Sequence, residues 1–358
     1  MKQMNKEEKK LSNRIRTATR TASALLLTAT LCGTTAPTSA DSVADFYRGK
    51  TVSIVIAAGP GGGHTQYSLL IAPYLKKHMP GNPTFITQNM GGAGGTKAAN
   101  YLYNRAAQDG SAIGILLSDT PFASRLRTTG VKYVADRFHY LGGAEKTRSA
   151  FVVFKSAGVS SLADMRKKQV IMGSTGKGSQ TFILPTLANA MLGTKFKVVK
   201  GYRGMNGVYL AMDQAEVQGF QAVWSSVAFL RPQWLKNDLV TVLFANALDP
   251  LPDRPRVPLF KDLISDPMDK KIAELIGGNG ILGRGWLAPP GVPRDRIKAL
   301  RTTYEKVFKD SGVIRDAKKR GMIWTPVAWS DQQQQASRIT AADEALFKRM
   351  RAALKVKK

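Results

Sequence analysis

The stretch from Thr51 to Leu117 decides the fold of this chain, because one local pattern occurs in it twice. It opens with Thr51-Val-Ser-Ile-Val-Ile-Ala-Ala58, then Gly59-Pro-Gly-Gly-Gly-His64 and an amphipathic run to Met79. It continues with Thr84-Phe-Ile-Thr-Gln-Asn89, Met90-Gly-Gly-Ala-Gly-Gly95, a helical run to Arg105, and Ala112-Ile-Gly-Ile-Leu-Leu117. The order strand, glycine loop, helix, strand, glycine loop, helix, strand predicts a parallel sheet.

Both glycine loops are expected at one edge of this sheet, because strand-to-helix loops follow the carboxyl ends of parallel strands. Backbone N–H groups at the start of a helix lack intrahelical partners and carry partial positive charge. Two such helix starts side by side would form a binding site for an anion. Tight turns that need the positive φ of glycine explain a single loop of this kind equally well.

Composition limits the possible classes of function. The chain has 358 residues, enough for two domains, and its 43% hydrophobic and 22% charged content is typical of globular proteins. Its 53 basic and 25 acidic residues give a net charge of +28. This excess is compatible with a solvated surface or with attraction of small anions. Nucleic acid is disfavoured as a partner, because the basic residues are scattered and no binding module is recognisable.

The first 40 residues have the pattern of an export signal. A basic segment precedes the apolar run from Ala22 to Cys32, and the small-residue segment Ala36-Pro-Thr-Ser-Ala40 follows. Residues 1–40 are therefore predicted to be a cleaved signal peptide, which implies a periplasmic protein. The apolar run is too short to span a bilayer. Because Cys32 is the only cysteine, the cleaved chain would contain no disulfide.

A second α/β unit is expected from about residue 146. Its apolar strand Val170-Ile-Met172 leads into a third glycine loop, Gly173-Ser-Thr-Gly-Lys-Gly-Ser-Gln180, and a helix. The glycines at 277–283 indicate a crossing back to the first unit, and Ser330 is expected to cap one final helix. The predicted fold class is α/β with two lobes, each a mostly parallel sheet flanked by helices, joined by two hinge crossings. Lobe 1 comprises residues 41–145 and 279–358, lobe 2 comprises residues 146–278, and a hinge of this kind creates a cleft.

Several enzymatic site types fit the sequence poorly. A dinucleotide fingerprint needs a small residue where His64 stands and an acidic residue where Gln88-Asn89 ends the second strand. The serine hydrolase motif G-x-S-x-G is absent. Ser174 lies in a glycine loop, but a nucleophilic serine needs a neighbouring base. The three histidines, at positions 64, 78 and 139, are too scattered to suggest a metal site. We therefore expect no catalytic activity, no cofactor and no metal.

An ordered set of motifs across residues 45–325 resembles one known family. The set comprises Gly59-Pro-Gly-Gly-Gly-His64, Gln88-Asn-Met-Gly-Gly-Ala-Gly-Gly95, Ala107-Gln-Asp-Gly110, Gly173-Ser-Thr-Gly-Lys-Gly178, Gly201-Tyr-Arg-Gly204, Glu216-Val-Gln-Gly219 and Ala288-Pro-Pro-Gly-Val-Pro293. It resembles the Bug-type (TctC-like) extracytoplasmic solute-binding proteins of tripartite tricarboxylate transporters. The resemblance implies a Venus-flytrap fold without catalytic activity, an organic carboxylate as ligand, and the membrane subunits of such a transporter as partners. We expect a monomer.

The family's ligand contacts, mainly backbone amides and ordered water, can be carried over to matching positions. The residues implied are Gly61, Gly62, Gly63, His64, Thr65, Ala93, Gly94, Gly95, Ser118, Thr175, Gly176, Gly178, Ser179, Tyr202 and Trp224. Many members carry Asp near the position of His64. A histidine there could donate to an anion and titrate near neutral pH, or could lie at the rim in contact with water alone. Tyr202 and Trp224 fit cavity walls and core positions equally well.

These observations favour a transport receptor for a small organic carboxylate. The first lobe would hold the ligand while the cleft is open, and the loop at Gly173–Gln180 would then close over it. The alternatives are a carboxylate sensor without a transporter and an enzyme that acts on a carboxylate. The sequence leaves the ligand open among di- and tricarboxylates, aromatic acids, amino acids and nicotinate-like acids.

Overall fold

The repeated strand, loop and helix pattern forms part of the first of two five-stranded sheets. The computed structural model describes residues 42–126 and 130–356, and the chain from Val43 onward forms one compact unit. The expected signal peptide, with Cys32, lies outside the described residues.

The first sheet has the strand order β2-β1-β3-β10-β4. Strand β1, between β2 and β3, runs parallel to both of these neighbours, with Ile54 opposite Thr87 on one side and Ile113 on the other. Because helices cover both faces, Val52, Ile54, Val55 and Ile56 of β1 are all fully buried. The strands are β1 (Thr51–Ile56), β2 (Thr84–Asn89), β3 (Ala112–Ile115), β4 (His139–Gly143) and β10 (Gly285–Ala288).

The second sheet has the order β7-β6-β8-β5-β9. Its strand β6 leads into the third glycine loop and runs parallel to β7 and β8. The strands are β5 (Ser149–Phe154), β6 (Val170–Ser174), β7 (Phe196–Lys200), β8 (Gly219–Val223) and β9 (Val240–Asn246).

Each sheet contains one strand that runs against the other four. Strand β10 is antiparallel to β3 and β4, and β5 is antiparallel to β8 and β9. Each is the strand that enters its sheet directly after a crossing from the other sheet. The predicted class, two mostly parallel sheets flanked by helices, is confirmed.

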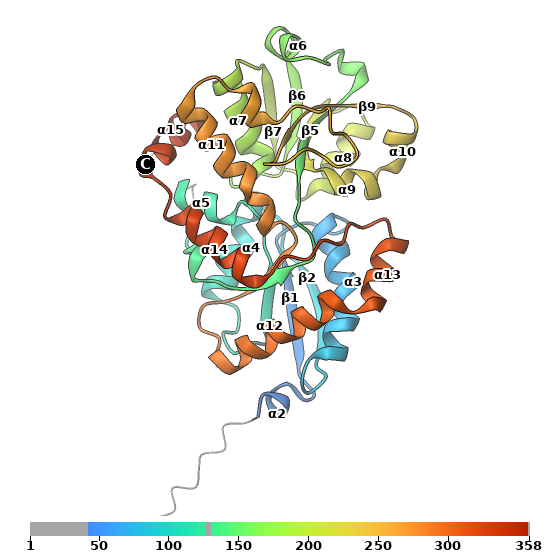
Figure 1. Cartoon of the computed structure of the whole chain (residues 1–358), viewed down its shortest axis with the longest axis vertical. Helices are drawn as coiled ribbons and strands as arrows, with labels where there is room; N and C mark the ends of the chain where they lie inside the picture. The colour runs from blue at the N-terminus through green and yellow to red at the C-terminus, as the bar shows by residue number, and fades with distance from the viewer. Residues whose placement is uncertain (1–41, 127–129, 357–358) are drawn as a thin grey trace, which may run out of the picture. The chain divides into compact units, whose positions relative to one another are not determined.

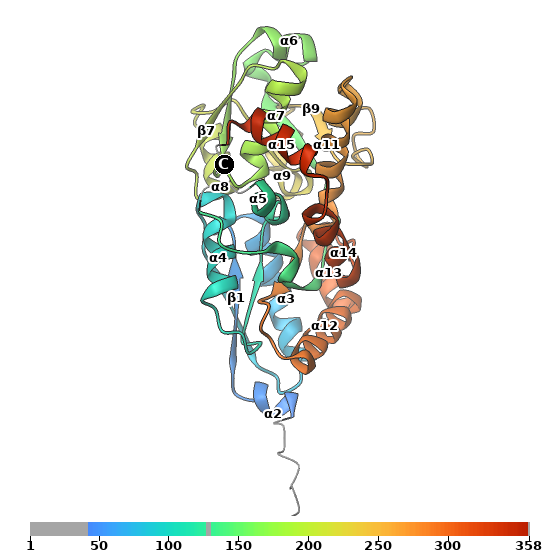
Figure 2. The ribbon, with the colours of Figure 1, turned by 90° about the vertical axis from the view of Figure 1, so that its left-hand side faces the viewer.

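Helices surround the two sheets (Figures 1 and 2). In the hydrophobic cluster on one side of the first sheet, Tyr67 of α3, Leu300 of α12 and Val313 of α13 lie together with Ile54 and Ile56 of β1. The helices are α2 (Val43–Tyr47), α3 (Gly63–His78), α4 (Thr96–Asn104), α5 (Thr120–Leu126), α6 (Leu162–Lys167), α7 (Gln180–Leu192), α8 (Met205–Asp213), α9 (Trp224–Leu230), α10 (Pro232–Lys236), α11 (Pro267–Gly277), α12 (Arg294–Lys309), α13 (Ser311–Lys319), α14 (Trp329–Thr340) and α15 (Glu344–Leu354).

The C-terminal segment differs from the expectation of one final helix. It forms two helices, α14 and α15, because Asp343 starts the second by accepting a hydrogen bond from the N–H of Ala345. The residue before α14 is Ala328, so Ser330 is not a cap.

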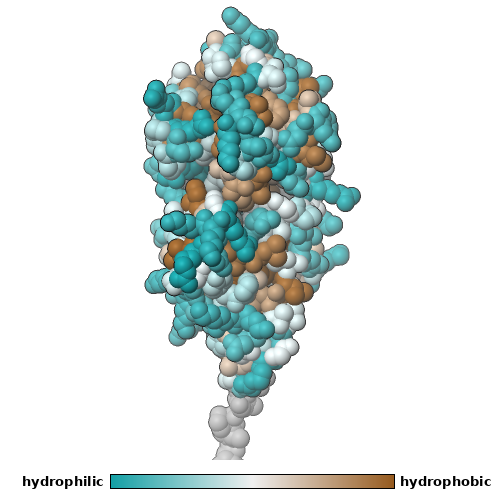
Figure 3. Space-filling view, turned by 90° about the vertical axis from the view of Figure 1, so that its right-hand side faces the viewer, coloured by the Kyte–Doolittle hydropathy of each residue, from teal (hydrophilic) through white to brown (hydrophobic). Residues whose placement is uncertain are grey.

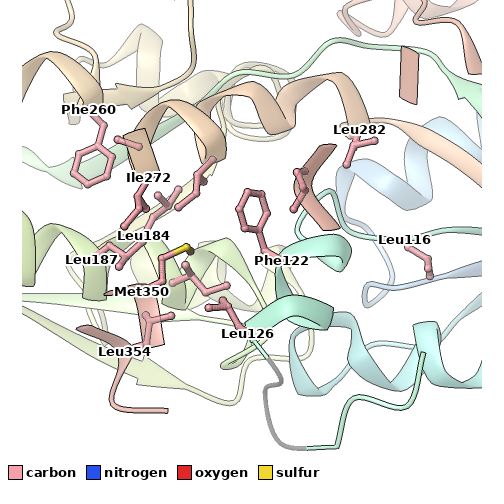
Figure 4. Close-up of a cluster of buried hydrophobic side chains, with 14 of the residues drawn as sticks. Leu116, Phe122, Leu126, Leu184, Leu187, Phe260, Ile272, Leu282, Met350 and Leu354 are labelled. Carbon is pink, nitrogen blue, oxygen red and sulfur yellow. The ribbon is translucent and has the colours of Figure 1, made fainter. Parts of the chain in front are cut away.

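Helix α15 also departs from the sequence-based division of the lobes, which assigned residues 279–358 to lobe 1. Its buried residues Phe347 and Met350 belong to a hydrophobic cluster with Leu184 of α7 and Ile272 of α11, which flank the second sheet. Phe122 of α5 joins the same cluster (Figure 4). This C-terminal helix thus packs between elements of both lobes.

Hydrophilic side chains cover most of the face shown in Figure 3, with smaller hydrophobic areas between them. Within residues 42–126 and 130–356, no helix combines the length and the apolar character needed to cross a membrane.

Candidate functional site

The glycine loops of the two lobes meet face to face. The N–H of Gly59 donates to the carbonyl of Arg203 at 3.0 Å across the lobes. A Cβ on Gly94 would lie 2.7 Å from the backbone N of Ser179, and a Cβ on Gly176 would lie 2.7 Å from that of Gly94. Both glycines also have positive φ, of +61° and +143°. Only glycine at these positions allows the two loops to approach so closely.

A cavity of about 100 Å³ lies where the loops meet, and residues of both lobes line it. Eight of the predicted ligand residues are in its wall: Gly62, Gly63, His64, Gly94, Gly95, Ser118, Thr175 and Ser179. Seven others are not among its lining residues: Gly61, Thr65, Ala93, Gly176, Gly178, Tyr202 and Trp224.

The first loop presents the uncapped start of a long helix to the cavity. Helix α3 has 16 residues and begins at Gly63, and no side chain caps it. Among the described residues, the N–H groups of Gly63, His64 and Thr65 have no hydrogen-bond acceptor. The hydroxyl of Thr65 donates to the carbonyl of Gly59 at 3.3 Å and accepts from Asn89 at 2.8 Å. Thr65 therefore shapes the loop, while the helix start supplies free donors and partial positive charge.

In the third glycine loop, by contrast, side-chain hydroxyls of the loop and of α7 accept hydrogen bonds from several backbone N–H groups. The Thr175 N–H donates to the Thr181 hydroxyl at 3.0 Å, and the Gly176 N–H donates to the Ser174 hydroxyl at 3.2 Å. Ser179 caps α7 by accepting from the Thr181 N–H at 3.1 Å. These amides are already satisfied, so this loop offers fewer free donors than its glycines suggest.

Asp119 bridges the two lobes. It follows β3 in the first lobe, and its carboxylate accepts a hydrogen bond from the backbone N–H of Gln180, the first residue of α7. The residue is 4% exposed and lines the cavity. Burial raises the pKa of Asp119 to about 6, although the hydrogen bond from Gln180 acts in the opposite direction. A fraction of the molecules therefore carries a protonated Asp119 near neutral pH.

A buried ion pair holds Arg284, another residue of the wall. Arg284 and Glu145 each have side chains that are 2% exposed, and Arg284 Nε lies 3.5 Å from Glu145 Oε2. The same carboxylate oxygen accepts from the Tyr67 hydroxyl at 2.9 Å. Arg284 Nη1 lies 3.0 Å from His64 Nδ1, and Nη2 donates to the Ser226 hydroxyl. Because burial of an unpaired charge is costly, Glu145 allows the guanidinium to stay in the cavity wall.

His64 is held as a neutral ring. A guanidinium has only donors, so His64 Nδ1 must accept from Arg284. Burial and the positive charge of Arg284 lower the pKa of His64 to about 3. The expectation that this histidine titrates near neutral pH is therefore wrong, although the residue does line the cavity.

The two aromatic residues predicted as cavity walls, Tyr202 and Trp224, do not line the cavity. Trp224 lies in a hydrophobic cluster of the second lobe, and its indole N–H donates to the Asp253 carboxylate at 2.9 Å. The Tyr202 hydroxyl donates to Glu216 at 2.6 Å. The aromatic residue in the cavity wall is instead Tyr209 of α8, which is fully buried. Burial raises the pKa of Tyr209, and the nearby charges of Arg284 and Arg231 counteract this in part.

Four polar side chains of the cavity wall were not predicted from the sequence: Asp119, Arg284, Tyr209 and Ser226. Asp119 directly follows the predicted Ser118, so its place after a buried strand was a usable signal. Arg284, between two glycines of the second crossing, gave no such signal. Among the described residues, no group of three or more His, Cys, Asp or Glu side chains could hold a metal ion.

Comparison with known proteins identifies the fold. No family model and no curated protein matches the sequence. The structure is similar to that of the periplasmic binding protein BugD, with a TM-score of 0.67 and 16% identity over 86% of this chain and 98% of that chain. It is similar to MatC from Rhodopseudomonas palustris with bound malate, with a TM-score of 0.64 and 18% identity over 85% of this chain and 99% of that chain.

A further R. palustris protein, solved with adipate, has a TM-score of 0.63 and 18% identity over 86% of this chain and 97% of that chain. The resemblance to Bug-type proteins is thus confirmed at the level of the fold. The chain has the two-lobed fold of periplasmic solute-binding proteins.

Proposed function

We propose that this protein binds a small organic carboxylate in the cavity between its lobes. The observation that carries the proposal is the uncapped start of α3 in the cavity wall, where the N–H groups of Gly63 and His64 have no acceptor among the described residues. An anion is the group that such a helix start stabilises best.

The size of the cavity supports a small ligand. Its volume is about 100 Å³, and residues of both lobes enclose it. Two proteins of similar fold were solved with malate and with adipate, which are small carboxylates. A charge-assisted hydrogen bond contributes roughly 1.5–3 kcal/mol, so four or five donors could supply micromolar affinity.

We further propose that the ligand is bound outside the cytoplasm and delivered to membrane subunits of a tripartite tricarboxylate transporter. The export pattern of residues 1–40 and the periplasmic origin of BugD support this part of the proposal. Contacts across the cleft, from Gly59 to Arg203 and from Gln180 to Asp119, would make the closed form distinct from the open one. A transporter could recognise that difference.

A thermal-shift screen of the chain without residues 1–40 tests the binding step. The panel is malate, succinate, adipate, aspartate and nicotinate, with succinamide as the uncharged match for succinate. At 100 times its dissociation constant, a ligand adds about 2.7 kcal/mol to the unfolding free energy. We expect at least one acid, and not succinamide, to stabilise the protein in proportion to the logarithm of its concentration. No stabilisation by any of the five acids would contradict the proposed function.

A further inference from the structure

The cavity contains a cluster of side-chain donors that the glycine loops do not explain. Arg284 comes from the second crossing, Tyr209 from α8 and Ser226 from α9, so both lobes contribute. A Cβ on Gly63 would lie 2.6 Å from Arg284 Nη2 and 2.8 Å from Ser226 Oγ. The guanidinium, the serine hydroxyl and the start of α3 therefore occupy one small region.

Several donors in this cluster have no protein acceptor. A guanidinium carries five N–H groups, two of them on each Nη atom. Within the described residues, Arg284 donates one hydrogen bond from Nη1 and one from Nη2, and Nε has no hydrogen-bond partner. Ser226 Oγ accepts from Arg284, which leaves the proton of Ser226 free to donate.

Tyr209 gives independent evidence. Its side chain is fully buried in the cavity wall, and its hydroxyl has no hydrogen-bond partner among the described residues. A buried hydroxyl without a partner is destabilising, and the Tyr209 side chain lies in the wall of the proposed binding cavity. A ligand acceptor atom in the cavity would satisfy it.

The balance of charge at this cluster favours an anion. The groups that converge are a guanidinium, two hydroxyls, a neutral imidazole and the positive end of α3. The Asp119 carboxyl also lines the cavity, but it accepts a hydrogen bond from the N–H of Gln180 and burial raises its pKa. The Glu145 carboxylate lies on the Nε side of Arg284, where the Tyr67 hydroxyl also donates to it. The Nη atoms are therefore the part of Arg284 that remains available to a second carboxylate.

We infer that Arg284 and Tyr209 bind one carboxylate group of the ligand, with Ser226 and the start of α3, as a side-chain subsite for the anion. This inference rests on the proposed function, and it assigns recognition of charge to two side chains in addition to loop amides. The required ligand class is an acid with at least one unmodified carboxylate, because a carboxamide would place an N–H₂ group against these donors.

Removing the Tyr209 hydroxyl tests the inference without disturbing a protein contact. Tyr209→Phe should leave the unfolding free energy of the unliganded protein unchanged or raise it, because the hydroxyl has no partner to lose among the described residues. It should weaken binding about tenfold or more, measured by calorimetric titration with malate, succinate, adipate, aspartate and nicotinate. Tyr304→Phe is the matched control, because Tyr304 of α12 is also fully buried with an unpartnered hydroxyl, but is not a cavity residue.

A second variant tests the arginine. Arg284→Met combined with Glu145→Gln removes both charges of the buried pair, so neither charge is left unpaired. We expect this variant to lose most of the preference for succinate over succinamide, which loss of packing alone would not change.

The possible outcomes separate the two proposals. If the wild type binds none of the five acids, the proposed function fails. If the wild type binds but Tyr209→Phe binds equally well, or Tyr304→Phe weakens binding to the same extent, the subsite is wrong while the function stands. A double variant that retains the preference for succinate over succinamide would also overturn the role of Arg284.

Discussion

Replacing Asp119 with asparagine should remove one pH-dependent cost to the stability of this protein. Burial raises the pKa of Asp119 from its ordinary value of 3.8 to about 6. Between these values the Asp119 carboxyl binds more protons in the native state than in the unfolded state, so its contribution to the unfolding free energy of the wild type falls as pH rises. The cost is absent below about pH 4 and fully present above about pH 6. Asparagine has no such titration.

The magnitude follows from the two pKa values. Their difference of about 2 corresponds to roughly 3 kcal/mol, of which about 2 to 3 kcal/mol falls between about pH 4 and pH 8. Asp119→Asn should therefore gain about 2 to 3 kcal/mol relative to the wild type over this interval. Urea unfolding followed by tryptophan fluorescence at several pH values measures the difference. Glu274→Gln is the control, because Glu274 is exposed and has no ion pair among the described residues.

Separation of the lobes could relieve the cost of burying the ionised Asp119 carboxylate without unfolding the protein, because Asp119 contacts Gln180 across the cleft. Small-angle scattering at about pH 5 and pH 8 would detect a larger radius of gyration of the wild type at the higher pH, and not of Asp119→Asn. The same pH dependence of wild type and Asp119→Asn in both unfolding and scattering would refute a raised pKa of Asp119.

Two further substitutions test the closed cleft and the C-terminal helix. Gly176→Ala should weaken carboxylate binding about tenfold or more in calorimetry, because its Cβ would lie 2.7 Å from the backbone N of Gly94 in the opposite lobe. Gly201→Ala, with φ of +120° and no atom within 4 Å of its Cβ, carries backbone strain without this clash and should bind normally. Phe347→Ala should lower the unfolding free energy by about 3–5 kcal/mol in urea titrations, because the ring is fully buried between α15 and α5. Equal binding by the two alanine variants, or an unfolding free energy unchanged in Phe347→Ala, would contradict the packing described here.

The fold could be predicted because its defining signals are local. The apolar strand Thr51–Ile56, its glycine loop and the following amphipathic helix are contiguous in the chain, and the same pattern precedes α4 and α7. The short strands β4 and β10 were missed because the glycines in their sequences weaken the strand pattern. The break between α14 and α15 was missed because the apolar periodicity continues across it.

The chemistry of the site was harder to predict because it depends on contacts between distant residues. Arg284 acquires its place in the wall from Glu145 and His64, which precede it by more than a hundred positions. Trp224 fitted the pattern of a cavity wall, but Asp253 holds its indole within the second lobe.

The third glycine loop had the glycines of an anion-binding turn. Its own hydroxyls, from Ser174, Ser179 and Thr181, satisfy several of its amides. The sequence contains these hydroxyl side chains, but it does not indicate which backbone amides they accept hydrogen bonds from.

Hydrogen exchange with and without ligand tests the central claim most directly, namely that donors from both lobes enclose one small acid. The protein is saturated with whichever acid of the panel binds most tightly, and exchange is followed in peptides that cover residues 59–66, 203–210 and 222–228. We expect slower exchange in the first-lobe peptide and in at least one second-lobe peptide at the same ligand concentration. Protection confined to one lobe, or protection only at sites outside the cavity, would contradict this claim.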